Sequence, residues 1–144
     1  MNLKESSSKK PCLGCPFRRH NTNEKPNPGG SHPMVYLGQI HGPFWLPCHQ
    51  DKNYDGKGSD IETVSQCRGA AVFRSNCETI NTLPKQLLSL PEDRSLVFSN
   101  ESEFVQHYLE VDSTMAEILT EKSELEKYTT EELTKISETR RYHV

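Results

Sequence analysis

Four of the five cysteines stand in short motifs that are typical of metal ligands. Cys12 and Cys15 are separated by two residues and flanked by prolines, so both sulfurs can point into one tight turn. A Cys-x-x-Cys turn supplies two thiolates of a tetrahedral metal site, and two single cysteines farther along the chain can supply the others. The candidates are Cys48, in a Pro-Cys-His sequence, and Cys67, in a Cys-Arg-Gly sequence. We therefore predict one metal site held by these four cysteines.

The identity of the metal stays open between zinc and a [4Fe–4S] cluster. Zinc commonly takes four cysteines, but most zinc ribbons pair two Cys-x-x-Cys knuckles, and a second knuckle is missing here. His49, next to Cys48, is an alternative metal ligand. Widely separated cysteines can also hold a [4Fe–4S] cluster, which prolines beside Cys12, Cys15 and Cys48 would help to shield. Zinc is the leading expectation on its frequency in proteins alone, and the cluster is the alternative.

Other cysteine and histidine chemistry has weaker support in the sequence. Cys77 lies in a predicted helix without a motif around it, so we expect it to be a core residue. Thioredoxin-like enzymes open a helix with Cys-x-x-Cys after a strand, whereas a charged segment precedes Cys12 here, and no upstream histidine completes a zinc-deaminase signature. His41, His49 and Asp51 have the residue types of a metal-dependent nuclease, without a recognisable spacing. An enzyme is therefore the third hypothesis for this chain.

Basic and aromatic residues surround the cysteine motifs. Arg18, Arg19 and Lys25 predict a basic face, with Phe17 and Trp45 among the nearby aromatic residues. Basic groups interleaved with aromatic rings suit single-stranded nucleic acid or RNA. The leading hypothesis is thus a non-catalytic module in which a metal holds a face that binds nucleic acid or a partner protein. An iron–sulfur protein with a redox or sensing role is the alternative.

The chain is small and polar. Its 144 residues predict one domain with an appendage, and its 33 % hydrophobic content limits the core, so a metal crosslink would supply stability. It has no apolar run long enough to cross a membrane, and its basic N-terminus is not followed by the apolar segment of a secretory signal. Five cysteines without such a signal favour reduced thiols. We therefore expect a cytoplasmic protein that does not bind membranes.

Charge is distributed unevenly along the chain. Residues 1–100 carry 12 Lys and Arg against 9 Asp and Glu, whereas residues 101–144 carry 5 against 11. We therefore divide the chain into a flexible N-terminus at 1–10, a cysteine-ligated metal-binding domain at 11–98 and an acidic helical tail at 99–144. The tail has one narrow apolar stripe, so we expect it to pack on the metal domain, on a basic protein partner or on a second copy.

Regular elements are expected to be short in the metal domain. Gly, Pro and Asn separate the cysteine motifs, which predicts loops between them. Short apolar runs predict strands at 34–37, 44–46 and 96–98. A helix is expected from about 69 to 80, and Pro84 predicts the start of a short helix at 85–89.

The tail contains two matches to a helix capping box, Asn100 with Glu103 and Thr129 with Glu132. Both predict a helix start, and apolar residues between 115 and 125 predict a longer helix between them. The predicted fold class is therefore α+β: a small, loop-rich, metal-stapled domain with short strands, followed by an acidic helical C-terminal region.

The cysteine motifs also resemble those of a known family. Pro-Cys-x-x-Cys-Pro-Phe-Arg-Arg at 11–19, Leu-Pro-Cys-His at 46–49 and Cys-Arg-Gly-Ala-Ala at 67–71 are similar to motifs of small, uncharacterised proteins of bacteriophages and bacteria. The similarity covers about residues 11–76. It implies a cysteine-ligated site and is compatible with a phage origin. A phage-encoded protein would then be expected in the host cytoplasm. It implies no reaction.

Overall fold

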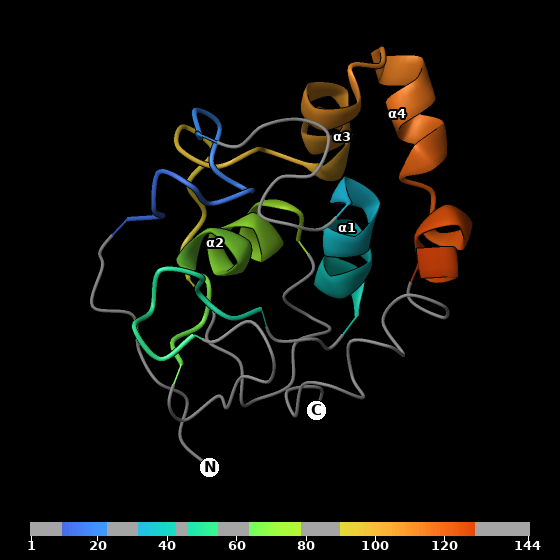
Figure 1. Cartoon of the computed structure of the whole chain (residues 1–144). Coiled ribbons are helices and arrows are strands. Elements are labelled where there is room, and N and C mark those ends of the chain that lie inside the picture. Colours follow the sequence, from blue (N-terminus) through green and yellow to red (C-terminus); the bar gives the residue numbers. More distant parts are fainter. Residues whose placement is uncertain (1–9, 23–31, 43–45, 55–63, 79–89, 129–144) are drawn as a thin grey trace.

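The computed structural model describes four labelled helices joined by loops. The described residues are 10–22, 32–42, 46–54, 64–78 and 90–128. The helices are α1 (Pro33–His41), α2 (Arg68–Asn76), α3 (Glu101–Leu109) and α4 (Ser113–Leu119). α3 packs against both α1 and α4, and α2 lies among the loops on the other side of α1 (Figure 1). None of the described helices has the length and apolar character needed to span a membrane.

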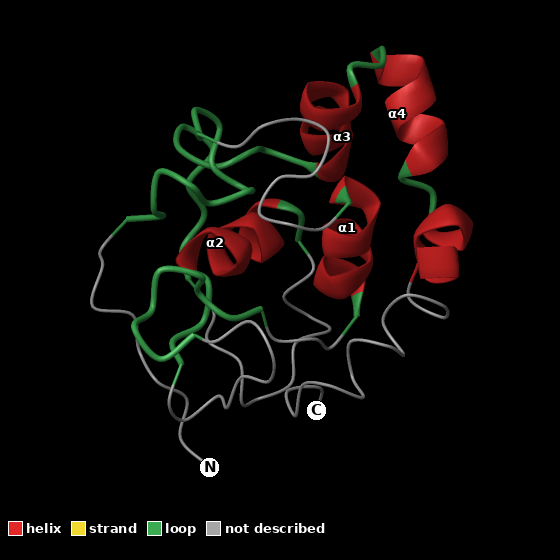
Figure 2. Ribbon diagram, viewed as in Figure 1, coloured by secondary structure: helices red, strands yellow, loops and turns green. Residues whose placement is uncertain are grey.

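The expected α+β fold class is wrong, because the described part of the chain contains helices and loops and no strand (Figure 2). Residues 34–37 belong to α1. Pro33 stands in the first turn of this helix, and the His32 ring accepts the Met34 N–H at 3.2 Å, so both residues favour a helix start. A short apolar run is shared by strands and buried helices, and here the helix start decides between them.

The other expected strands are replaced by isolated contacts. Arg18 pairs with Val97 and Pro47 with Gln66, each through a single antiparallel bridge. These bridges hold segments together that are distant in sequence, and they do so without forming a sheet. Four expected elements lie partly or wholly outside the described residues: the strand at 44–46, the end of the helix at 69–80, the helix at 85–89 and the helix after Thr129.

The remaining helix predictions are confirmed at their starts. α2 covers most of the predicted 69–80 helix. α3 begins where the capping box placed it, with Asn100 Oδ1 accepting the Glu103 N–H at 2.8 Å. The longer tail helix is shorter than expected, since α4 ends at Leu119 and helical structure resumes only at 122–128.

One apolar core joins the cysteine-rich segment to the first helix of the tail. Phe17 follows the Cys-x-x-Cys turn, Phe73 lies in α2 and Phe104 lies in α3. All three side chains are fully buried, and their ring centroids are 5.0, 5.4 and 5.6 Å apart. Tyr108 of α3 adds a hydrogen bond from its hydroxyl to the Pro16 carbonyl. The core therefore extends across the boundary that charge and pattern place at 98–99.

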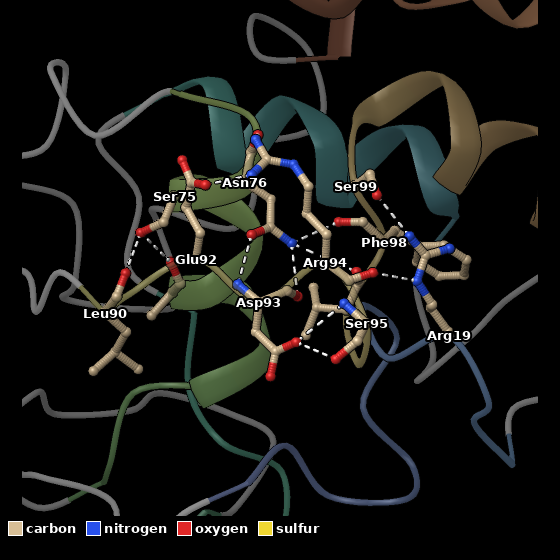
Figure 3. A network of polar contacts seen from close by, with 12 residues as sticks. Arg19, Ser75, Asn76, Leu90, Glu92, Asp93, Arg94, Ser95, Phe98 and Ser99 are labelled. Atoms are coloured by element: carbon tan, nitrogen blue, oxygen red, sulfur yellow. Dashed lines mark hydrogen bonds and ion pairs between the residues drawn. The ribbon is translucent and has the colours of Figure 1, made fainter.

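A polar network attaches the 90–99 segment to the end of α2 (Figure 3). The buried Asn76 amide donates to the carbonyl oxygens of Asp93 at 3.1 Å and Phe98 at 2.9 Å, and its oxygen accepts the Asp93 N–H at 3.0 Å. Arg94 donates to the Asn76 carbonyl at 2.9 Å. Because these buried groups are satisfied, the network fixes the loop that leads into α3.

We predict that Phe104→Ala lowers the free energy of unfolding by about 3–5 kcal/mol, because it removes a buried ring from the aromatic core. Equilibrium denaturation in urea measures the change. Ile118→Ala on α4 is the matched control, since that side chain is 48 % exposed and its loss should change stability by about 0.5 kcal/mol or less. Equal effects of the two substitutions would show that α3 does not share a core with the cysteine-rich segment.

Candidate metal centre

The four motif cysteines repeat one local arrangement. In each case the sulfur accepts the backbone N–H of the residue two positions later. The donors are Gly14 for Cys12, Phe17 for Cys15, Gln50 for Cys48 and Gly69 for Cys67. Backbone N–H groups aimed at a sulfur stabilise its thiolate form, which is the form that binds a metal. The backbone therefore acts in the same direction on the pKa of all four thiols, although it is outweighed by burial at Cys12 and Cys48 and by the hydrogen bond with Cys67 and burial at Cys15.

The four sulfurs also lie within electrostatic reach of one another. Cys15 Sγ and Cys67 Sγ are 3.7 Å apart. The charges of Cys67 and Cys48 act on Cys12, and the charge of Cys67 acts on Cys48. This sulfur–sulfur distance is far longer than a disulfide bond of about 2.05 Å, so Cys15 and Cys67 are free thiols. Cys15 and Cys67 are thus in contact, and Cys12 and Cys48 lie close enough for their pKa values to feel the charge of Cys67.

Backbone hydrogen bonds position these segments. In the knuckle, the Cys15 N–H donates to the Cys12 carbonyl at 3.0 Å, which closes the turn. The segments that carry the two single cysteines are paired, because the Cys48 N–H donates to the Ser65 carbonyl and the Cys67 N–H to the Leu46 carbonyl, both at 2.8 Å. These bonds flank the isolated bridge described above. The local sequence therefore builds a turn on one side of the site and a paired loop on the other.

Gly69 makes the approach of the knuckle to α2 possible. A Cβ atom at this position would lie 2.1 Å from Cys15 Sγ, a distance that no real contact allows. Cys67 is the N-cap residue of α2, so its sulfur lies at the positive end of the helix dipole. Because Gly69 has no side chain, Cys15 can approach the N-terminal end of α2 beside Cys67.

The pKa values of the four thiols are shifted in two directions. The hydrogen bond with Cys67 and then burial raise the pKa of Cys15 well above its usual value. Burial is the main cause that raises the pKa of Cys12 and of Cys48. The pKa of Cys67 is lowered, mainly by the hydrogen bond that Cys15 donates and also by backbone N–H groups and Arg74. One sulfur thus favours the thiolate, and a metal must displace protons from the other three.

Cys77 differs from the four motif cysteines. It follows the last turn of α2 and packs partly buried against the core, where the sequence placed it. Its pKa is raised strongly by burial and then by the Glu101 carboxylate. Such a thiol is a poor metal ligand and a poor nucleophile.

The residues of the nuclease hypothesis contact different parts of the structure. The exposed His49 ring stacks on Tyr54 with centroids 4.6 Å apart. The Asp51 carboxylate accepts hydrogen bonds from the Ser65 N–H and hydroxyl, both at 2.9 Å. His41 lies 2.7 Å from a Glu101 oxygen, between α1 and α3. The contacts described for these three side chains are with different residues, so they lend the hypothesis no geometric support.

The arginines of the expected basic face make intramolecular contacts. Arg19 donates to the Arg94 carbonyl at 2.8 Å and to Ser99 Oγ at 2.6 Å, and it forms an ion pair with Glu103 of α3. Arg18 donates to the Pro11 carbonyl at 3.1 Å. Arg19 therefore ties the knuckle to the tail. Lys25 lies outside the described residues.

Sequence reasoning missed two residues of this site, Gly69 and Arg74. Gly69 is the last residue of the Cys-Arg-Gly motif that begins at Cys67, and its position two residues after a predicted ligand was the available signal. Arg74 lies seven residues after Cys67, which places both on one face of a helix. Neither signal is specific without knowledge of what packs against α2.

The described side chains, as they stand, do not form a closed metal-ligand cluster. No group of three or more His, Cys, Asp or Glu residues within the described ranges is arranged to hold a metal ion. Within the described residues, the sulfur pair with a printed close approach is Cys15 and Cys67, and the lack of a side chain at Gly69 leaves room for it. Cysteine thiolates are the ligands that a thiophilic metal prefers. The 3.7 Å separation of Cys15 Sγ and Cys67 Sγ is close to the about 3.8 Å edge of a tetrahedron with Zn–S bonds of about 2.3 Å.

Comparisons with known proteins returned no match, whether against protein-family models, curated proteins or solved structures. The motif resemblance therefore stays a prediction. The support for the site comes from the geometry of the chain itself.

We predict that Gly69→Ala separates the knuckle from α2. The added Cβ would overlap Cys15 Sγ at 2.1 Å, so the free energy of unfolding should fall by about 1–3 kcal/mol or more, and Cys15 should become reactive to a thiol reagent. Denaturation and the rate of thiol modification measure the two effects.

Gly14→Ala is the matched control for this substitution. A Cβ at Gly14 meets Thr22 Oγ1 at an ordinary 3.8 Å, so stability should hold or rise by up to about 1 kcal/mol. A Gly69→Ala protein as stable as the Gly14→Ala protein, with Cys15 still protected, would contradict the close approach.

Proposed function

We propose that this protein is a four-cysteine zinc protein, in which one ion held by Cys12, Cys15, Cys48 and Cys67 joins the knuckle, the 46–51 loop and α2. The observation that carries the proposal is the 3.7 Å approach of Cys15 Sγ to Cys67 Sγ, supported by the backbone N–H groups that lower the pKa of each of the four thiols. Cys77 stands outside this set. The ion would act as a structural crosslink, and the folded chain would act as a binding module.

The short sulfur–sulfur distance favours a single ion over a [4Fe–4S] cluster. Cys15 Sγ and Cys67 Sγ at 3.7 Å have the separation expected of two thiolates on one tetrahedral zinc. The four cysteine ligands of a cluster bind four different irons and stand much farther apart. A mononuclear site therefore needs less rearrangement of this pair than a cluster does.

A structural ion suits the composition of the chain. The ligands come from segments 36 and 55 residues from Cys12, and the hydrophobic fraction is 33 %. A crosslink between such segments stabilises a fold whose core is small. Because a preformed site is absent in the unfolded chain, the binding free energy of the metal becomes folding free energy.

We predict that the protein purifies with about one zinc per chain, and that cobalt replaces zinc with the intense visible absorption of tetrahedral thiolate ligation. Zinc binding at pH 7 should release about three to four protons, because the raised pKa values keep Cys12, Cys15 and Cys48 protonated without metal. Metal analysis, absorption spectroscopy and a pH indicator in weak buffer measure these quantities.

Cysteine substitutions distinguish the ligand set. Replacing any one of the four ligands by Ser should lose the stoichiometric metal and much of the folded structure, whereas Cys77→Ser, the matched control, should keep one zinc. A broad visible band and bound iron after anaerobic purification would establish the cluster instead. A wild-type protein that folds and binds neither metal would refute the proposed function.

The surface of α4 supports a protein partner for the binding module. Met115 and Ile118 are 45 % and 48 % exposed, one helical turn apart, and Asp112, Glu117 and Glu121 are exposed around them. An apolar pair bordered by carboxylates suits a partner segment that is apolar and basic. The same carboxylates repel phosphate, and Arg19 is engaged within the chain, so nucleic acid has less support.

We predict that a basic amphipathic peptide of Lys and Leu binds the zinc-loaded protein, and that Ile118→Ser weakens the binding about tenfold. Loss of charge in Glu117→Gln should weaken it further at low salt and have little effect at high salt. Leu13→Ser is the control, since Leu13 is also exposed but lies in the knuckle. Fluorescence anisotropy measures the affinities. Binding of a single-stranded oligonucleotide at low salt, without binding of the peptide, would overturn the partner assignment.

A further inference from the structure

The contact between Cys15 and Cys67 brings together two thiols that are distant in the chain. Their sulfurs are 3.7 Å apart, although the residues are separated by 52 positions in the sequence. Both are free thiols. A disulfide bond of about 2.05 Å requires the two sulfurs to move about 1.7 Å closer. Rotation about the Cα–Cβ bonds of the two residues can supply this movement.

The backbone holds the two thiols in this position from both sides. In the knuckle, the Cys15 N–H donates to the Cys12 carbonyl at 3.0 Å, and at the start of α2 the Cys67 N–H donates to the Leu46 carbonyl at 2.8 Å. Gly69 leaves open the space that a Cβ atom would occupy, 2.1 Å from Cys15 Sγ. The fold therefore brings the pair into contact before any bond forms.

The two thiols differ in their access to solvent. Cys15 is buried, with 2 % of its surface exposed, whereas Cys67 is half-buried. A reagent that arrives from solvent therefore reaches Cys67 first, and Cys15 is the neighbouring thiol that can complete a bond. Redox-active cysteine pairs commonly combine an accessible thiol with such a second, resolving thiol.

We propose that Cys15 and Cys67 form a redox site at which a small-molecule disulfide, such as oxidised glutathione, produces an intramolecular disulfide bond. The Cys67 thiolate attacks one sulfur of the small disulfide, which forms a mixed disulfide and releases one small thiolate. The Cys15 thiolate then attacks Cys67 Sγ, so that the protein disulfide forms and the second small thiolate leaves. The two protein thiols give up two electrons and two protons, and the small disulfide takes them up to become two thiols.

The new bond would use two of the four sulfurs proposed as zinc ligands, so its formation releases the ion. This release rests on the zinc site proposed above, whereas the bond itself needs only the two thiols. The disulfide connects the knuckle to the N-terminal end of α2, which are segments that the ion would also join. Oxidation thus replaces a metal crosslink by a covalent one at the same contact.

Cys12 and Cys15 are the alternative pair, because Cys-x-x-Cys turns form disulfides in many redox proteins. These two residues are three positions apart, so loop entropy in the unfolded chain favours their bond over one that spans 52 positions. In the folded chain, the contact described for Cys15 Sγ is with Cys67. The folded and the unfolded protein should therefore give different disulfides.

The test maps the disulfides of the full-length protein. The protein is treated with oxidised glutathione, its remaining thiols are alkylated, and its peptides are analysed by mass spectrometry. The folded protein should contain Cys15–Cys67 as its main disulfide, in about tenfold excess or more over Cys12–Cys15, and reduced glutathione should reverse the bond. The same chain unfolded in urea with a chelator is the matched control and should give mainly Cys12–Cys15. Zinc-loaded protein should release about one ion per disulfide formed, which a chromophoric chelator detects.

Substitutions test the steric condition for the bond. Gly69→Ala places a Cβ atom 2.1 Å from Cys15 Sγ, so disulfide formation should slow about tenfold or more. Gly14→Ala, the matched control, adds a Cβ atom with an ordinary contact of 3.8 Å and should leave the rate within about twofold of wild type. Cys77→Ser should also leave the rate unchanged, because Cys77 lies at the other end of α2.

The inference is overturned if the folded protein forms mainly Cys12–Cys15, keeps a stable mixed disulfide at Cys67, or does not oxidise this pair. If Gly69→Ala does not fold, the disulfide map of the wild-type protein decides alone. A protein that binds no zinc but forms the Cys15–Cys67 bond refutes the proposed function and supports this inference. A zinc protein that does not form the bond refutes this inference only.

Discussion

The structure depends on the close approach of the Cys-x-x-Cys knuckle to the first turn of α2. Cys15 Sγ lies 3.7 Å from Cys67 Sγ, and the absence of a side chain at Gly69 is the steric condition for this contact. Phe17, two residues after Cys15, reaches the centre of the aromatic core. The knuckle therefore meets α2 twice, once through sulfur at the helix N-terminus and once through the rings of Phe17 and Phe73.

The two contacts join the proposed metal site to the core. A polar chain of this size buries limited apolar surface, and a metal crosslink between distant segments would add stability without adding to the core. The aromatic cluster in turn extends to Phe104, so that α3 packs where the knuckle and α2 meet. A loss of packing at one contact is therefore expected to weaken the other, because both act on the same pair of segments.

Two arginines in the described part of the chain, Arg19 and Arg74, bind groups within the protein. Arg19 lies in the sequence next to the knuckle, yet its guanidinium binds Ser99 and Glu103 and thereby attaches the tail. Arg74 is buried among the carbonyls at the end of α1. The acidic surface of α4 remains exposed around Met115 and Ile118. This division of charge is the physical basis for placing the partner surface on α4.

Part of the structure could be predicted from the sequence, because it depends on interactions between residues that are close together in the chain. The capped start of α3 follows from residues that bond within a few positions, and such an interaction needs no tertiary context. The ligand set of four cysteines, with Cys77 outside it, was predicted from spacing in the same way and stays a prediction. The helical state of residues 34–37, the engagement of Arg19 with Glu103, and the roles of Gly69 and Arg74 were decided only by the tertiary structure. An apolar run, an arginine or a glycine is compatible with several environments, and the partner that selects one lies far away in the sequence.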